Sequence, residues 1–214
     1  MVHKSVVRSV VKKVVCSDRI IALKVKAQWM PTLEHDDGVE ELYNIIEAIF
    51  EEDGKGDTDT IIMGVWNSVK CGQVLGLELL AQAVDDAKSN AEDNNITNCN
   101  FFVGKAEDIL SSVINRALKE DILAVVDPPR AGLHQRALVH LRRTEKLGKL
   151  LFLSCDPKAA VKNFVDLSRP ASKMYHGAPF VPMCAVPVDM FPHTSHCELV
   201  IYFERVDLSQ LENP

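Results

Sequence analysis

The chain has 214 residues, of which 47% are hydrophobic and 25% are charged, a composition that excludes a wholly disordered polymer and predicts a folded core. Its formal net charge is -6 at pH 7, so any contact with a polyanion must come from local basic patches rather than from overall attraction. No apolar run is long enough to cross a bilayer, and the six cysteines form no CxxC pair or compact disulfide framework, which indicates free thiols in a reducing compartment.

The first 58 residues form an N-terminal fragment whose fold the sequence does not define, with an acidic helix expected over Gly38–Glu52. Its basic, valine-rich start, Met1–Lys26, lacks the uninterrupted apolar core and the cleavage site of a secretory signal. We therefore expect an intracellular protein of the cytosol or nucleus, and a mitochondrial address stays open. Residues 59–208 are interpreted as the main domain and residues 209–214 as a tail.

From Gln73 onward, short apolar runs alternate with helix-like stretches, which is typical of βα units around a parallel sheet. Thr60–Trp66 is a candidate for one further strand. The predicted strands lie near Val74–Leu79, Asn100–Val103, Ile122–Asp127 and Leu150–Cys155, and the predicted helices near Ala81–Asn94, Ala106–Leu118, Gln135–Arg143 and Lys158–Leu167. The sequence therefore predicts an α/β fold.

The end of the chain changes character. Phe180–Asp189 and Glu198–Arg205 are β-rich runs with no helix-length segment between them, which predicts an antiparallel pair at one edge of the sheet. The connection, Met190–Cys197, is rich in Pro, His, Thr and Ser. It is predicted to be a loop that projects polar side chains.

The segment DPPRAG, residues 127–132, follows a predicted strand. Two consecutive prolines fix φ and remove hydrogen-bond donors, so the chain must leave the sheet in an extended conformation. The Asp127 carboxylate is then held at the carboxyl end of its strand, which is where open α/β sheets bind ligands. The pattern favours a functional acid at this position.

The segment SCDP, residues 154–157, ends another predicted strand at the same edge and begins a helix. Asp156 is a suitable N-cap and Pro157 suits the first helical turn. The positive end of the helix dipole favours the thiolate form of Cys155, although buried structural cysteines are also common. The polar loop after Asp189 then delivers Glu198 to the start of the last strand, where burial of a carboxylate is costly unless it has a function.

DPPRAG, SCDP and DMFPHTSHCE (residues 189–198) together resemble, in order and spacing, the RNA uracil-5-methyltransferase family, and specifically its eukaryotic tRNA members that make ribothymidine in the T-loop. The likeness covers about residues 73–206. It implies the Rossmann-like sheet of a class I S-adenosylmethionine-dependent methyltransferase. It also implies methylation of C5 of uridine in RNA, with a tRNA T-loop uridine as the expected substrate.

The resemblance implies specific roles for five side chains. Cys155 would add to C6 of uridine, because covalent addition makes C5 nucleophilic enough to accept a methyl group. Glu198 would then remove the C5 proton as a general base. The cofactor S-adenosyl-L-methionine would be contacted by Glu78 at its ribose hydroxyls, by Asp108 near its adenine, and by Asp127, which would face both cofactor and base.

The chain departs from the family's pattern ahead of Glu78, where a strand, a glycine-rich loop and a helix normally hold the methionine part of the cofactor. Only residues 67–72 separate the candidate strand Thr60–Trp66 from Gln73, whereas a parallel crossover needs about a dozen residues. We therefore expect that this strand pairs differently, or that the sheet lacks its intact first strand together with the loop and helix. The alternative function is a truncated, catalytically impaired isoform that retains the base pocket and only binds RNA.

Other interpretations are weaker. His-x-x-His-Cys is not a usual zinc-ligand spacing, so no metal is expected at a group made of Cys155, His193, His196 and Cys197, and the two histidines are better explained as hydrogen-bonding loop residues. A Cys/His hydrolase would need an oxyanion loop that the sequence does not show. Two basic runs suit solvated helix faces better than RNA patches, one within Met1–Lys26 and one made of Arg136, Arg142, Arg143, Lys146 and Lys149. No membrane partner is expected, and the oligomeric state stays open.

Overall fold

The computed structural model describes the backbone of residues 59–63 and describes residues 73–118, 121–191 and 193–205 in full. The expected N-terminal fragment 1–58 with its acidic helix, the basic start of the chain and the tail 209–214 lie outside the described residues. None of the helices in the described ranges combines the length and apolar character needed to span a membrane.

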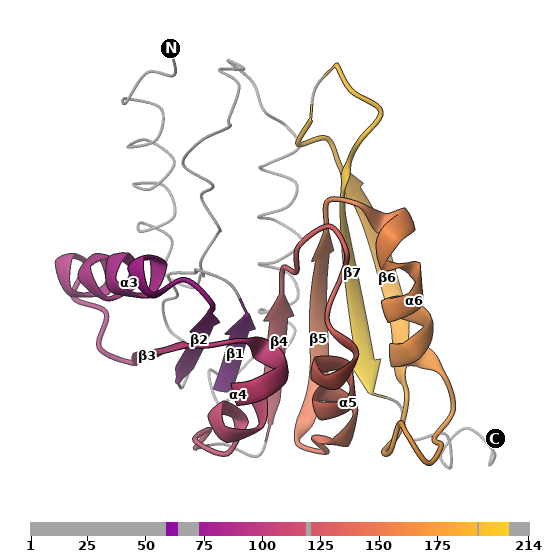
Figure 1. Ribbon diagram of the computed structural model, residues 1–214, viewed down its shortest axis with the longest axis horizontal. Helices are drawn as coiled ribbons and strands as arrows, with labels where there is room; N and C mark the ends of the chain where they lie inside the picture. The colour runs from indigo at the N-terminus through magenta and orange to yellow at the C-terminus, as the bar shows by residue number, and fades with distance from the viewer. Residues whose placement is uncertain (1–58, 64–72, 119–120, 192, 206–214) are drawn as a thin grey trace.

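From Val74 onward, strands and helices alternate until the described chain ends in two successive strands (Figure 1). Every strand and helix predicted between Val74 and Arg205 is present, with ends displaced by at most four residues. The elements are β1 Asp59–Met63, β2 Val74–Glu78, α3 Ala81–Asp93, β3 Cys99–Val103, α4 Ala106–Ile114, β4 Ile122–Val126, α5 Gln135–Arg143, β5 Leu147–Ser154, α6 Pro157–Ser168, β6 Phe180–Val188 and β7 Glu198–Arg205.

The strands form one seven-stranded sheet in the order β3-β2-β1-β4-β5-β7-β6. The first five strands in this order are parallel to their neighbours, and β7 runs antiparallel between β5 and β6. The predicted antiparallel pairing of the last two strands is therefore confirmed. The α/β fold class is confirmed as well.

The first strand differs from the expectation. β1 occupies the centre of the sheet and pairs in parallel with both β2 and β4, so the prediction that the sheet lacks this strand, or pairs it differently, is wrong. Strand β1 ends at Met63, and residues 64–66 of the predicted strand lie outside the described residues. Two five-residue strands are only about 17 Å long. The ten residues between them can span up to about 33 Å, which is enough chain for a parallel return, and residues 64–72, where the glycine-rich loop and helix were expected to be lacking, lie outside the described residues.

The main core lies between the sheet and helices α4, α5 and α6, which cover its front face in Figure 1. Alternate strand residues point into it, because successive side chains of a strand face opposite sides of the sheet. These residues are Leu75 and Leu77 of β2, Ile122, Ala124 and Val126 of β4, Leu150 and Phe152 of β5, and Ile201 and Phe203 of β7. Each buried side chain of this size contributes about 1.5–3 kcal/mol, which fixes the strands and hence the residues at their ends.

One buried and one partly buried arginine connect the helix ends at the amino-terminal side of β5. Arg142 is fully buried and donates to carbonyls at the end of α6 and to the Gly177 carbonyl. Arg205 donates to five carbonyls, among them three at the end of α5, and burial together with the charge of Arg142 lowers the pKa of Arg205 to about 10. The assignment of Arg142 to a solvated basic run is therefore wrong. Its guanidinium is buried and donates the hydrogen bonds that the carbonyls at a helix end would otherwise accept from water.

Candidate active site

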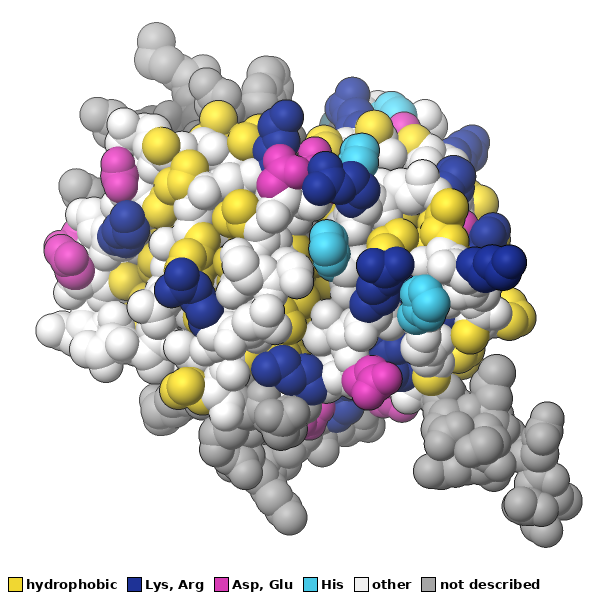
Figure 2. All heavy atoms as spheres, turned by 60° about the horizontal axis from the view of Figure 1, so that its bottom comes forward, with side chains coloured by type: hydrophobic (Ala, Val, Ile, Leu, Met, Phe, Trp, Pro, Cys, Tyr) yellow, Lys and Arg dark blue, Asp and Glu magenta, His cyan; other side chains and the backbone are white. Residues whose placement is uncertain are grey.

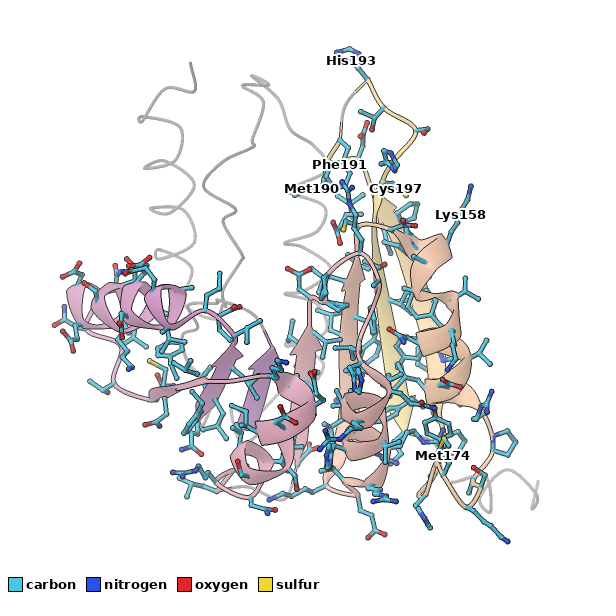
Figure 3. The ribbon with its side chains drawn as sticks, in the orientation of Figure 1. Lys158, Met174, Met190, Phe191, His193 and Cys197 are labelled. Carbon is cyan, nitrogen blue, oxygen red and sulfur yellow. The ribbon has the colours of Figure 1, made fainter. Side chains whose placement is uncertain are left out.

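One edge of the sheet collects four of the five candidate site residues. Glu78 ends β2, Asp127 follows β4, Cys155 follows β5, and Glu198 begins β7. Because β7 runs antiparallel to β5, its first residue lies at the same edge as the last residues of the parallel strands. Figure 3 shows this edge at the top, below the loop that carries His193 at its tip.

Cys155 and Glu198 are brought together by the ladder between β5 and β7. The pairing runs from Lys149 opposite Glu204 to Ser154 opposite Leu199, so Cys155 directly follows, and Glu198 directly precedes, the last paired residues of the two strands. Facing residues in an antiparallel pair have Cα atoms about 4.5–5.5 Å apart and side chains on the same face. The thiol is free and half-buried, and the glutamate is 9% exposed. A thiol and a carboxylate from segments 43 residues apart in the sequence thus lie at the same end of two neighbouring strands.

The helix after the cysteine begins as the sequence predicts. Asp156 is the N-cap of α6, its side chain accepts a hydrogen bond from the Ala159 amide at 3.2 Å, and Pro157 is the first helical residue. The cap ends the strand directly after Ser154 and leaves Cys155 in the bend between strand and helix. At that position the thiol lies near the positive end of the helix dipole.

The DPPRAG segment is held against α6 by a residue that sequence reasoning missed. Asn163, which is 6% exposed, accepts a hydrogen bond from the Leu133 amide at 2.6 Å and donates one to the Leu133 carbonyl at 3.2 Å. Gly132 has a φ of 80°, and a side chain there would collide with Asn163. The loop that starts at Asp127 and the helix that follows Cys155 are therefore clamped together. A polar residue on the buried stripe of α6, between Ala160 and Leu167, was the available sequence signal.

The two remaining acids lie on the side of β2 and β3. The Glu78 carboxylate accepts a hydrogen bond from the Leu80 amide at 3.0 Å, and the Glu78 carbonyl accepts one from Gly104 at 2.8 Å. The turn after β3 is thus fixed beside Glu78. Asp108, in the first turn of α4, forms an ion pair with Arg136 of α5 at 3.2 Å. Both side chains are about half exposed or more. Through this ion pair, Asp108 connects the first turn of α4 to α5.

The loop between β6 and β7 is fixed by its own side chains. Thr194 donates its hydroxyl to the Phe191 carbonyl at 2.7 Å and accepts the His196 amide at 3.2 Å. His193 has a φ of 63° and is exposed. No three His, Cys, Asp or Glu side chains of the described chain are arranged to hold a metal ion, so the four residues weighed as zinc ligands give no support to that interpretation.

The sequence of this chain is similar to those of known proteins. The family model for tRNA (Uracil-5-)-methyltransferase matches residues 64–206. The human tRNA (uracil-5-)-methyltransferase homolog A is 46% identical over 150 residues, which are 70% of this chain and 24% of that protein. The Danio rerio homolog B is 45% identical over 148 residues, which are 67% of this chain and 31% of that protein. The chain thus spans about a quarter to a third of these curated relatives.

Solved structures give the same assignment. The Pyrococcus abyssi tRNA (uracil-54, C5)-methyltransferase in complex with S-adenosyl-L-homocysteine matches with a TM-score of 0.55 and 26% identity, covering 76% of this chain and 38% of that one. An rRNA methylase from Streptococcus thermophilus matches with a TM-score of 0.54, 14% identity, and coverage of 77% and 96%, which supports the fold alone. The sheet is the Rossmann-like sheet of class I methyltransferases. The chain belongs to the tRNA (uracil-5-)-methyltransferase family.

Proposed function

We propose that this chain carries the catalytic part of an S-adenosylmethionine-dependent enzyme that methylates C5 of uridine in RNA, with a tRNA T-loop uridine as substrate. The observation that carries the proposal is the β5–β7 pairing, whose last pair, Ser154 and Leu199, is flanked by Cys155 and Glu198 at one edge of the sheet. Relatives whose names specify tRNA uracil-5 methylation support the choice of reaction and substrate. Residues 59–208 form the catalytic unit in this proposal.

The two residues act in sequence on one pyrimidine ring. The Cys155 sulfur bonds to C6 of uridine, and the C5–C6 π electrons shift toward O4, which gives C5 the electron density to bond a methyl carbon. The Glu198 carboxylate then accepts the C5 proton. The electrons of the C5–H bond restore the C5–C6 double bond, and sulfur leaves as thiolate.

The residues around Glu78 suit the proposed cofactor, which supplies the methyl group when bound. A carboxylate at the end of β2 can accept hydrogen bonds from ribose hydroxyls. Beside it, Leu79 and Leu80 are 56% and 64% exposed, an apolar surface of the kind that an adenine ring covers. Asp127 lies between this surface and Cys155 in strand order, where it can contact both cofactor and base.

The proposal is tested with 5-fluorouridine tRNA and S-adenosylmethionine. Fluorine at C5 cannot leave as a proton, so a productive enzyme accumulates a covalent adduct that survives denaturing electrophoresis. We expect the adduct with the wild-type chain and none with Cys155→Ala. With ordinary uridine, Glu198→Gln should accumulate the methylated adduct that the wild type releases. Equal trapping by Cys155→Ala would refute the assignment of the nucleophile.

The truncated, impaired isoform remains the second candidate, because the family's glycine-rich loop is not recognisable between β1 and β2 in the sequence. Titration calorimetry with S-adenosylmethionine separates the two candidates. Heat of binding that is weakened by Glu78→Gln supports the enzyme. No heat at millimolar cofactor, together with retained tRNA binding, would leave only the RNA-binding isoform.

A further inference from the structure

Positive charge is concentrated in one part of this acidic chain. The whole chain carries 24 Lys and Arg against 30 Asp and Glu, whereas residues 130–176 carry ten Lys and Arg against three Asp and Glu. This segment comprises α5, β5, α6 and the turns around them. A strong local charge asymmetry within a chain of opposite net charge is typical of a surface that binds an anionic partner.

Helix α5 presents these charges as one stripe. Arg136, His140 and Arg143 are spaced i, i+4 and i+7, so they lie along one side of the helix. The opposite side, which includes Leu138 and Leu141, is buried in the core. In Figure 2, Lys, Arg and His side chains gather on the half of the visible face that holds α5 and α6.

His140 lies between the two arginines of the stripe. Burial lowers the pKa of His140, and the charges of Arg143 and Arg136 lower it further, so the charges of both arginines reach the imidazole. Arg136 of the stripe forms an ion pair with Asp108 of α4 at 3.2 Å, and the two exposed cations on α6 and at its C-cap, Lys162 and Arg169, each form one with Asp166, at 2.6 and 3.1 Å. Within the described part of the chain, no acidic side chain forms an ion pair with Arg143.

A neighbouring turn widens the surface. The Gln135 side chain donates to the Met174 sulfur at 3.2 Å and to the Tyr175 hydroxyl at 3.4 Å, which holds the turn before β6 against α5. Lys173, in the same turn, is exposed. Its ammonium therefore extends the positive surface beyond the helix.

We propose that the α5 stripe and Lys173 form a docking surface for the phosphate backbone of RNA, separate from the catalytic edge. The inference rests on the proposed function, because it places a remote part of the same substrate. A membrane surface fits less well, since a helix that inserts into lipid needs a free apolar face, and the apolar face of α5 is buried in the core.

The geometry also sets the size of the RNA. Arg143 lies beside the amino-terminal end of β5, as the bonds from Arg205 to Leu147 and to the end of α5 show, whereas Cys155 follows the other end of β5. Lys173 lies in the turn that Gln135 holds against α5. Eight residues of strand separate the two ends by about 26 Å. An RNA that reaches both must extend roughly eight stacked base pairs beyond its target loop. A whole tRNA meets this requirement, and a hairpin with a four-base-pair stem does not.

The test compares Arg143→Gln and Lys173→Gln with Lys88→Gln, a matched loss of one positive charge on α3, where Lys88 is 52% exposed. Affinity for whole tRNA and for the short hairpin is measured by fluorescence anisotropy between 50 and 300 mM salt. We expect each surface variant to weaken tRNA binding about three- to tenfold and to reduce the slope of log K against log salt by about one. The affinity for the short hairpin and the formation of the covalent adduct on Cys155 should stay unchanged.

Each other outcome has a defined meaning. If the wild type traps 5-fluorouridine tRNA but both surface variants bind tRNA as Lys88→Gln does, the docking surface is refuted and the proposed function stands. If the wild type neither binds nor traps tRNA, the proposed function fails first. Loss of binding to phosphatidylserine vesicles with tRNA binding intact would assign the surface to a membrane and overturn the inference.

Discussion

Replacing Asn163 by alanine removes the clamp between the DPPRAG loop and α6. Two hydrogen bonds to Leu133, at 2.6 and 3.2 Å, are lost. Each is worth about 0.5–1.5 kcal/mol, and the stranded amide and carbonyl add to the cost where water cannot reach them. Alanine returns about 0.5 kcal/mol because it favours the helix more than asparagine does. The free energy of unfolding should therefore fall by about 1–3 kcal/mol.

Urea denaturation followed by circular dichroism measures this loss. With a slope of about 2 kcal/mol per molar urea, the midpoint should fall by about 0.5–1.5 M at unchanged slope. The matched control is Asn94→Ala, which removes one exposed bond to the Asn90 carbonyl and should cost less than about 0.5 kcal/mol. If the midpoint of Asn163→Ala stays within about 0.2 M of the wild type, the clamp contributes nothing and the reasoning is refuted.

Three further changes test the packing and charge arguments. Gly132→Ala should also lower the urea midpoint, because φ is 80° and the new methyl group meets Asn163, and the double variant with Asn163→Ala should lose less than the sum of the two single losses. Full additivity of those losses would disprove the contact. Arg205→Lys should cost more than about 3 kcal/mol in a thermal scan, since lysine cannot reach the five carbonyls that the guanidinium serves; a change below about 1 kcal/mol would contradict that role. The pKa of Asp166 is lowered because hydrogen bonds from Lys162 and Tyr175 and nearby positive charges outweigh the raising effect of burial, so its stabilisation is complete above about pH 4 and is lost as the pH falls through the folded pKa. Asp166→Asn should therefore reduce the fall in the free energy of unfolding as the pH is lowered below about 4. An unchanged fall would show that the carboxylate is not responsible.

Local patterns predicted most of the fold. Apolar runs such as Ile122–Val126 and Leu150–Ser154 are strands because their side chains are buried on both faces of a parallel sheet. Asp156 and Pro157 predicted the start of α6 because capping depends only on neighbouring residues. The error at β1 arose because a typical crossover length was applied to strands short enough to need less chain.

Residues whose role depends on distant partners were less predictable. Arg142 belongs to a basic run in the sequence, yet it is buried because it serves carbonyls of α6 and of Gly177. Asn163 has no motif, because its partner Leu133 lies 30 residues earlier in the chain. Asp108 and Arg136 gave no sign of their ion pair, since they are on different helices.

The sequence alone determined which chemical groups this protein has and which strand or helix ends they occupy, since caps, prolines and apolar runs act over a few neighbouring residues. It placed Cys155 at the end of one strand and Glu198 at the start of another. Only the tertiary structure decided that the two lie at the same end of neighbouring strands, because the register of β5 against β7 is set by backbone hydrogen bonds and by burial of alternate side chains across the whole sheet. A shift of that register by one residue would turn the side chains of β7, Glu198 included, to the other face of the sheet, with every local pattern unchanged.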